Sequence, residues 1–318
     1  MEASVPPARG VRLEWADTPL RVREAFEAWA GSRVVQATSQ ASGFSPGVAA
    51  RLKLADGRGV FVKAIGSVPN PDSPAFHRRE ARVVARLPRT IAAPHLEWSY
   101  EEEGWVVLVF EEIHGHHPAQ PWRDDELQRV LSGLAELANA LTPSPLGETR
   151  TASEAVRRTL HGWQALLDGP PSDGLDAWSQ RYLVQLAELE AGAPDAVRGE
   201  TLLHFDVRAD NILMDDERVW FVDWPHACTG APWFDVVGLA PSVTMQGGPP
   251  AEEVFARYPG AAAVDDDAVT RAVAAVAGYF THQALLPPPP GIPTVRAFQA
   301  AQGVVAREWL AHRTGWRD

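Results

Sequence analysis

The sequence contains one cysteine, two lysines and no long apolar run. Cys228 is the only cysteine among 318 residues, so no disulfide can form within the chain, and we expect a reducing, cytoplasmic environment. No stretch of about 18 apolar residues is present, which argues against a membrane span. The first ten residues have no apolar core, so they do not resemble a signal peptide.

Basic residues are outnumbered by acidic ones. Lys and Arg together count 29 and Asp and Glu together count 41, which gives a formal net charge of −12. Nonspecific nucleic-acid binding depends on basic patches, so this balance argues against a nucleic-acid partner. It suits a cationic substrate, although acidity more often serves solubility alone. With 45% hydrophobic and 22% charged residues, the composition is that of a globular protein of about two domains.

The pattern of predicted elements changes near residue 113. Before it, the turn signal Asp56-Gly57 and several short β-compatible runs predict a hairpin-rich sheet. The predicted elements are strands at 34–38, 49–54, 60–65 and 105–110 and a helix at 74–88. After it, apolar residues recur with the helical period, which predicts helices around 127–141, 156–167 and 178–189. We therefore expect an α+β chain with a small β-rich lobe at 1–113 and a larger, mainly helical lobe at 114–318.

One segment holds the densest pattern of chemically active residues. It reads His204-x-Asp206-x-x-x-x-Asn211, followed by a hairpin and Asp223. A turn at Asp215-Asp216 would return Asp223 to the side of Asn211. Those two oxygen-bearing side chains suit Mg²⁺, which takes few protein ligands and fills its other positions with phosphate and water. Asp206 stands apart from them, where it would accept a proton from a hydroxyl group.

This segment resembles the catalytic and metal loops of the aminoglycoside phosphotransferases, which are protein-kinase-like kinases of small molecules. The resemblance covers about residues 34–240 and implies a bilobal protein-kinase-like fold. It implies that Asp206 accepts the proton of the substrate hydroxyl and that Arg208 stabilises charge on the transferred phosphoryl group. Asn211 and Asp223 would hold Mg²⁺ on the phosphates of ATP or GTP.

The same resemblance gives two neighbouring residues supporting roles. His204 would shape the loop by hydrogen bonding. Asp235 would accept hydrogen bonds from the backbone of the catalytic loop, with a helix N-cap as the alternative. Trp224-Pro225 stands where protein kinases have Phe-Gly, and the stretch from Asp223 to Asp235 is too short for an activation segment. A protein kinase is therefore not favoured.

Lys63 and Glu80 are charged residues on otherwise apolar faces. Strand alternation places Lys63 on one face with Phe61 and Ile65, and the helical period places Glu80 among apolar residues. An unpaired buried carboxylate is unfavourable, so an ion pair between Lys63 and Glu80 is predicted. In the resembling family such a pair positions the α- and β-phosphates of the nucleotide. The alternative is a surface lysine and a glutamate at the rim.

Two loops complete the expected nucleotide site. The loop Ser42-Gly43-Phe44-Ser45 lies between two predicted strands, where its backbone N–H groups would reach the phosphates unless it is a plain hairpin turn. By resemblance, the carbonyl of Glu111 and the N–H of Ile113 would face adenine in a hinge between the lobes.

Three other clusters have simpler interpretations. The histidines within 114–117 lack zinc-site spacing and indicate a solvated linker. The acidic run 265–267 suits the start of a helix, or would attract a cationic substrate. Trp122, Trp163 and Trp178 fall at helical spacing and suit the core, or would line a substrate cleft.

Together these patterns predict a phosphotransferase that uses ATP or GTP and acts on a hydroxyl of a small molecule, by resemblance an antibiotic. A kinase of a small metabolite such as choline or homoserine is one alternative, and a nucleotide-binding regulatory module without catalysis is another. Degenerate modules usually lack a metal ligand or the base, whereas Lys63, Glu80, Asp206, Asn211 and Asp223 are all present. A monomer and a homodimer are both compatible with the sequence.

Overall fold

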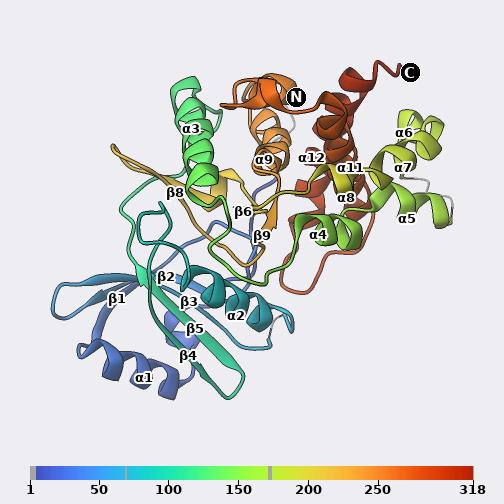
Figure 1. Ribbon diagram of the computed structural model, residues 1–318. Helices are drawn as coiled ribbons and strands as arrows, with labels where there is room; N and C mark the ends of the chain where they lie inside the picture. The colour runs from blue at the N-terminus through green and yellow to red at the C-terminus, as the bar shows by residue number, and fades with distance from the viewer. Residues whose placement is uncertain (1–4, 69, 171–173, 318) are drawn as a thin grey trace.

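The computed structural model describes residues 5–68, 70–170 and 174–317. Its N-terminal part is a five-stranded antiparallel sheet with the strand order β1-β2-β3-β5-β4 (Figure 1). The strands are β1 (Val34–Ser39), β2 (Val48–Leu54), β3 (Gly59–Ile65), β4 (Leu96–Glu102) and β5 (Trp105–Glu111). Four of the five agree with the predicted strands. The sequence did not reveal β4, because its exposed positions carry glutamates and its apolar residues are only half-buried.

Two helices cover opposite faces of this sheet: α1 (Leu20–Ala30) and α2 (Ser73–Val84) (Figure 1). The side chains of β5 alternate accordingly. Val107 and Val109 pack into the core that contains Phe26 of α1. Leu108 and Phe110 pack into the core that contains residues of α2 and of the helical part. The helix predicted to reach Pro88 ends earlier, at Val84, because a residue that precedes proline is disfavoured in the helical conformation and the last turn unwinds.

The rest of the chain is mainly helical, which confirms the α+β class. Its helices are α3 (Asp124–Ala140), α4 (Ala152–Thr159), α5 (Gly162–Asp168), α6 (Ala177–Arg181), α7 (Leu183–Ala191), α8 (Ala193–Ala196), α9 (Phe234–Met245), α10 (Ala251–Ala256), α11 (Asp266–Ala284) and α12 (Val295–Thr314). Two small antiparallel pairs complete it: β6 (Thr201–Leu203) with β9 (Cys228–Gly230), and β7 (Ile212–Met214) with β8 (Val219–Phe221). No described helix has the length and apolarity needed to cross a membrane.

The single helix predicted over 156–167 is wrong, because the structure has two helices there. α4 ends at Thr159 and α5 begins at Gly162. The Gly162 backbone lies so close to α11 that a Cβ atom would stand 1.9 Å from the carbonyl oxygen of Gly278. The carboxylate of Glu190 accepts hydrogen bonds from the N–H groups of Trp163 (3.0 Å) and Gln164 (2.9 Å), and so caps the new helix start.

The helix predicted over 178–189 is also divided, into α6 and α7, which meet at Tyr182. Asp176 caps α6 by accepting a hydrogen bond from the Ser179 N–H at 3.0 Å. Asp265 caps α11 in the same way through Ala268, which confirms the helix-start interpretation of that acidic run.

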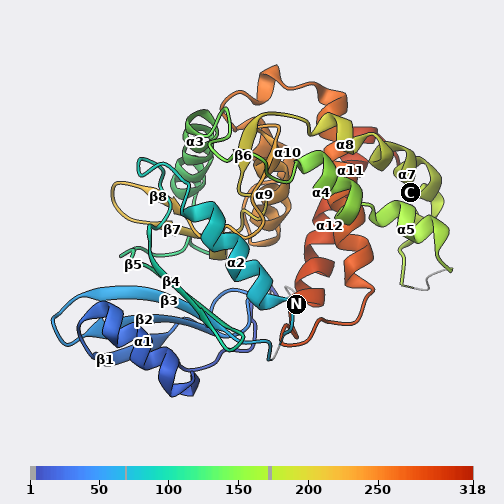
Figure 2. The ribbon, with the colours of Figure 1, turned by 60° about the horizontal axis from the view of Figure 1, so that its bottom comes forward.

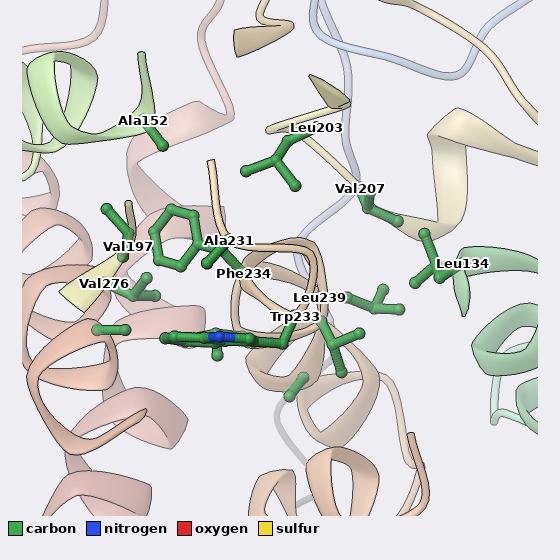
Figure 3. Close-up of a cluster of buried hydrophobic side chains, with 14 of the residues drawn as sticks. Leu134, Ala152, Val197, Leu203, Val207, Ala231, Trp233, Phe234, Leu239 and Val276 are labelled. Atoms are coloured by element: carbon green, nitrogen blue, oxygen red, sulfur yellow. The ribbon is translucent and has the colours of Figure 1, made fainter. Parts of the chain in front are cut away.

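The main core lies between α9, α11 and the small strands. In Figure 3 the rings of Trp233 and Phe234 lie among apolar side chains that include Leu203, Leu239 and Val276. Trp122, Trp163 and Trp178 are buried in the same core. The alternative in which these three tryptophans line a substrate cleft is therefore wrong.

The N-terminal segment joins the sheet to the helical part. The N–H groups of Gly10 and Leu13 donate to the carbonyls of Gly43 (3.0 Å) and Gly47 (3.1 Å) in the loop between β1 and β2. On the other side, Thr294 Oγ1 donates to the Arg9 carbonyl at 3.0 Å, beside the start of α12 (Figure 2). This segment therefore bridges the β1–β2 loop and α12.

Candidate active site

Lys63 of β3 lies at the centre of a buried ion cluster. Its Nζ is 2.6 Å from Glu80 Oε1 of α2 and 2.7 Å from Asp223 Oδ1, which follows β8. The predicted pair of Lys63 and Glu80 is confirmed. The ammonium group also lies 5.7 Å from the ring centroid of Phe110. The cluster therefore joins the sheet, α2 and the segment after the β7–β8 hairpin at one point.

The three charges perturb one another strongly. Burial, together with repulsion from Asp223, raises the pKa of Glu80 to about 7. Burial opposes ionisation of Asp223 too, but its ion pair and hydrogen bond with Lys63 outweigh that effect and lower its pKa. Burial and the charge of Lys63 lower the pKa of His77, which lies against the cluster, to about 4. Asp223 is thus held as a carboxylate, which is the form that a metal ion requires.

The β7–β8 hairpin brings Asn211 and Asp223 together as predicted. Ile212 pairs with Phe221, and the Val222 N–H donates to the Asn211 carbonyl at 2.9 Å. Asn211 Nδ2 donates to the Asp206 carbonyl (2.8 Å) and to Asp206 Oδ2 (3.2 Å). Its amide oxygen is therefore the atom turned away from Asp206. Asp206 also forms an ion pair with Arg208, whose guanidinium bonds Asp210 at 3.0 Å.

Buried contacts hold the loop that carries Asp206. Asp235 accepts hydrogen bonds from the N–H groups of His204 and Phe205, both at 2.8 Å, which confirms its predicted contact with the loop backbone. His204 is fully buried, and its Nε2 lies 2.8 Å from the Val222 carbonyl oxygen. Phe205 and Asp223 have positive φ angles of 67° and 71°. Such backbone conformations are unfavourable for these residues and concentrate at functional sites, where surrounding contacts impose them.

Arg12, which the sequence did not single out, fills the β1–β2 loop. Its guanidinium donates to the carbonyls of Gln40 (2.9 Å) and Gly43 (3.1 Å). It also donates to the carbonyls of Ser42 and Ser45. The Gly43 N–H meanwhile donates to the Ala8 carbonyl, so it faces the N-terminal segment. The N-terminal segment therefore places the guanidinium of Arg12 inside this loop.

The loop needs glycine at its end. Gly47 has a φ of 103°, and a Cβ atom there would stand 2.7 Å from the Ala64 carbonyl oxygen. A side chain at this position would push the loop away from β3. Arg12 escaped the sequence analysis because arginine is common in this chain and its partners are carbonyl groups, which have no sequence pattern.

A pocket of about 210 Å³ lies between the sheet and the β7–β8 hairpin. Its lining includes Lys63, Glu80, Asn211 and Asp223, the loop residues Ser42, Gly43 and Ser45, and the hinge residues Glu111 and Ile113. Among the described residues the Ile113 N–H has no hydrogen-bond partner, as a hinge that binds a base requires. His117, assigned to a solvated linker, also lines this pocket, with Nδ1 2.8 Å from the Ile212 carbonyl oxygen.

A second cavity of about 760 Å³ adjoins the pocket on the side of the helical part. The two share Ser45, Pro46, His77 and Asp223. Asp206 and Arg208 line this second cavity, and so does Phe44, whose ring lies 5.2 Å from the Arg208 guanidinium. Of the four loop residues predicted to reach the phosphates, Phe44 therefore faces away from the first pocket.

The donor set at the junction fits magnesium. Within the described chain no cluster of three or more His, Cys, Asp or Glu side chains is arranged to hold a metal ion. Magnesium needs no such cluster, because one or two protein oxygens together with phosphates and water complete its octahedron. Asp223, held ionised, and the amide oxygen of Asn211 supply such a pair.

Comparisons with known proteins show the fold and the family of this chain. A search of curated proteins found no match. A solved aminoglycoside phosphotransferase bound to ADP and hygromycin B shares 15% identity over 93% of this chain and 99% of its own, with a TM-score of 0.60. A choline/ethanolamine kinase family protein from Mesorhizobium loti shares 16% identity over 92% and 94%, with a TM-score of 0.62. Another aminoglycoside phosphotransferase, bound to GDP and kanamycin, shares 15% identity over 93% and 99%, with a TM-score of 0.60.

These likenesses establish the bilobal kinase-like fold that the sequence predicts. The model of the phosphotransferase enzyme family matches residues 41–273, which is most of the chain and includes Lys63, Asp206 and Asp223. The predicted activity class, transfer of a phosphate group to a hydroxyl, is confirmed by that match. The chain belongs to the phosphotransferase enzyme family.

Proposed function

We propose that this enzyme transfers the γ-phosphate of ATP or GTP to a hydroxyl group of a small molecule. The observation that carries the proposal is the meeting of the two cavities at Asp223. The smaller pocket has the ion cluster of Lys63 and the hinge, and the larger cavity has Asp206. A nucleotide in the first and an acceptor in the second would bring phosphate and hydroxyl together at the shared wall.

Each charged residue has a role that follows from its position. Lys63, fixed by Glu80, would bind the nucleotide phosphates, and Asn211 with Asp223 would hold Mg²⁺. When bound, the ion would neutralise charge on the phosphates. Asp206 would orient the acceptor hydroxyl and accept its proton. Arg208, which pairs with Asp206 in the structure, would turn its charge toward the transferred phosphoryl group.

The size of the second cavity bears on the acceptor. A volume of about 760 Å³ is in the range of pockets that enclose drug-sized ligands. The solved relatives with hygromycin B and kanamycin support a hydroxyl-bearing antibiotic, and hence a resistance enzyme. The choline/ethanolamine kinase family relative supports a small metabolite as the alternative. We place the enzyme in the cytoplasm, where its nucleotide is abundant and Cys228 stays reduced.

The test is ADP release with Mg²⁺ and ATP over a panel of hydroxyl-bearing antibiotics and metabolites, with the product identified by its phosphate. Asp206→Asn should reduce transfer at least about a hundredfold while nucleotide affinity stays within about twofold. Asp216→Asn, an exposed neighbour in the hairpin turn, is the matched control and should be unaffected.

Three results would contradict the proposal. Wild-type turnover by Asp206→Asn would remove Asp206 as the base. Nucleotide binding with no Asp206-dependent transfer to any compound would favour a regulatory module. Absence of nucleotide binding would remove the assignment of the first pocket.

A further inference from the structure

The second cavity is rich in arginine, although the chain as a whole is acidic. Besides Arg208, its lining includes Arg79, Arg150, Arg158 and Arg296. Each comes from a different part of the chain: α2, the segment before α4, α4 and α12. None of these four forms an ion pair with a carboxylate among the described residues. Four guanidinium groups thus line one cavity, and no carboxylate of the described residues forms an ion pair with any of them.

Arg150 is the most constrained of the four. One of its Nη atoms donates to the His226 carbonyl at 2.6 Å, and its guanidinium lies 5.5 Å from the ring centroid of Phe205. Its Nε is buried and has no hydrogen-bond partner among the described residues. Phe205 immediately precedes Asp206 in the chain, and Arg150 and Asp206 line the same cavity. The residue as a whole is half-buried and lines the cavity, so an oxyanion bound there would form charge-assisted hydrogen bonds with its remaining donors.

Neither Arg296 nor Arg79 has a negatively charged partner among the described residues. Arg296 donates to the side-chain oxygens of Gln283 (2.7 Å) and Gln299 (2.8 Å), which fix its position without cancelling its charge. Burial, followed by repulsion from Arg150, lowers the pKa of Arg79. Repulsion between positive charges in a partly buried cavity is reduced when an anion binds in that cavity.

Most carboxylates that line the same cavity already have partners in ion pairs or hydrogen bonds. Asp206 pairs with Arg208, and Asp223 pairs with Lys63. Asp235 uses both of its oxygens to accept from backbone N–H groups. Asp72, which is exposed, is the one lining carboxylate in the described chain without such a partner. A polycationic acceptor would therefore meet four guanidinium groups and one carboxylate that have no ion-pair partner among the described residues.

We propose that the acceptor is an anionic compound that carries a carboxylate or phosphate group beside an apolar ring, and that Arg150 and Arg296 bind its anionic group. This rests on the proposed function, because it assigns the second cavity to the acceptor. The ring is inferred from the aromatic side chains of the lining, Phe44, Phe76, Phe205, Tyr279, Phe280 and Phe298. The acidic balance of the whole sequence, which suits a cationic substrate, is therefore not the charge that the acceptor meets.

The test uses four benzyl alcohols that differ only in the para substituent: carboxylate, phosphonate, carboxamide and aminomethyl. Each is titrated by calorimetry into the full-length enzyme saturated with Mg²⁺ and AMP-PNP, so that the nucleotide pocket is already filled. We expect the carboxylate or the phosphonate to bind at least tenfold more tightly than the carboxamide, and the aminomethyl compound to bind least. The carboxylate and phosphonate arms distinguish the two kinds of anion.

The variants assign the effect to the cavity. Arg150→Gln and Arg296→Gln should each reduce the preference for the anion about tenfold and leave AMP-PNP affinity unchanged. Arg82→Gln on α2 and Arg157→Gln on α4 are matched controls, because both residues are exposed and line neither cavity. Both controls should keep the wild-type preference, and unchanged AMP-PNP binding shows that each variant is folded.

Several results would overturn the inference. Equal or tighter binding of the aminomethyl compound, a preference that survives both cavity variants, or no binding of either anion would each do so. The proposed function is judged separately, by nucleotide binding and by Asp206-dependent ADP release in the same preparations. Transfer to amino compounds alone would leave that function intact and remove this inference. An Arg150-dependent preference for anions without any Asp206-dependent transfer would remove the proposed function, and with it the assignment of the bound anion as the acceptor, and would leave only an anion site.

Discussion

Removal of the Asp235 carboxylate should separate the support of the catalytic loop from nucleotide binding. Asp235 is only 7% exposed, and its two oxygens accept from the N–H groups of His204 and Phe205, both at 2.8 Å. Those amides lie just before Asp206, and Phe205 has a positive φ of 67°. The carboxylate therefore stabilises a backbone conformation that the loop would not adopt unaided.

The loss in the free energy of unfolding can be estimated from the two hydrogen bonds that Asp235 accepts. Asp235→Ala leaves two buried N–H groups without acceptors, each at about 1–3 kcal/mol, so the range is about 2–6 kcal/mol. Burial of the carboxylate works against this, because it raises the pKa of Asp235 and so marks a cost of keeping the charge there. We therefore expect Asp235→Ala to lower the free energy of unfolding by about 2–4 kcal/mol, in the lower half of that range. Asp235→Asn keeps one acceptor and should lose about 1–2 kcal/mol.

Urea unfolding followed by tryptophan fluorescence measures this loss, and steady-state kinetics measure its effect on transfer. Because Asp235 does not line the nucleotide pocket, kcat should fall at least tenfold in Asp235→Asn while nucleotide affinity stays the same. Asp267→Asn, an exposed aspartate at the start of α11, is the control. A kcat within twofold of wild type, together with a stability loss below about 0.5 kcal/mol, would refute the argument that these two hydrogen bonds hold the loop.

Two further predictions concern Arg12 and Glu190. Arg12→Gln should weaken Mg·ATP binding about tenfold, because the β1–β2 loop loses its internal cation. Arg9 is exposed in the same segment, so Arg9→Gln is the control. Unchanged Mg·ATP affinity in Arg12→Gln would contradict a role of Arg12 in nucleotide binding. Burial raises the pKa of Glu190 from an ordinary 4.5 to about 7, so the folded state binds more protons than the unfolded state between those pH values. The free energy of unfolding should therefore fall by up to about 3 kcal/mol as the pH rises from about 4.5 to about 7. Glu190→Gln should flatten this fall in urea unfolding at pH 5 and 8, and an equal slope in both proteins would contradict it.

The predicted site residues come from local patterns with few solutions. Strand alternation places Lys63 on an apolar face, and the helical period does the same for Glu80. Because a buried charge without a partner is unfavourable, the two side chains are expected to pair. The hairpin turn at Asp215 fixed the pairing of β7 with β8, and with it the position of Asp223 beside Asn211. In each case the constraint acts over a few residues, so the sequence was sufficient to predict it.

The residues that the sequence did not reveal act over long separations. Arg12 bonds carbonyl groups about thirty residues away, and any residue type supplies a carbonyl. The division of the 156–167 helix depends on Gly278 and Glu190, which lie far along the chain in α11 and α7. The apolar residues of 156–167 do recur with the helical period. That pattern contains no information on the contacts with α11 and α7, and those contacts decide where the helix ends.

The same distinction separates the reaction from its acceptor. Asp206, Asn211 and Asp223, to which we assign the phosphotransfer chemistry, lie within one short segment and are visible as a motif. Arg79, Arg150 and Arg296 belong to three elements that only the folded chain brings together, and none is a fixed part of that motif. We expect a substitution at Arg79 or Arg296 to change the charge of this cavity while the loop that carries Asp206 keeps its contacts with Asp235. Membership of the family therefore fixes the class of reaction, and we expect the arginines around the second cavity to determine which acceptor is bound.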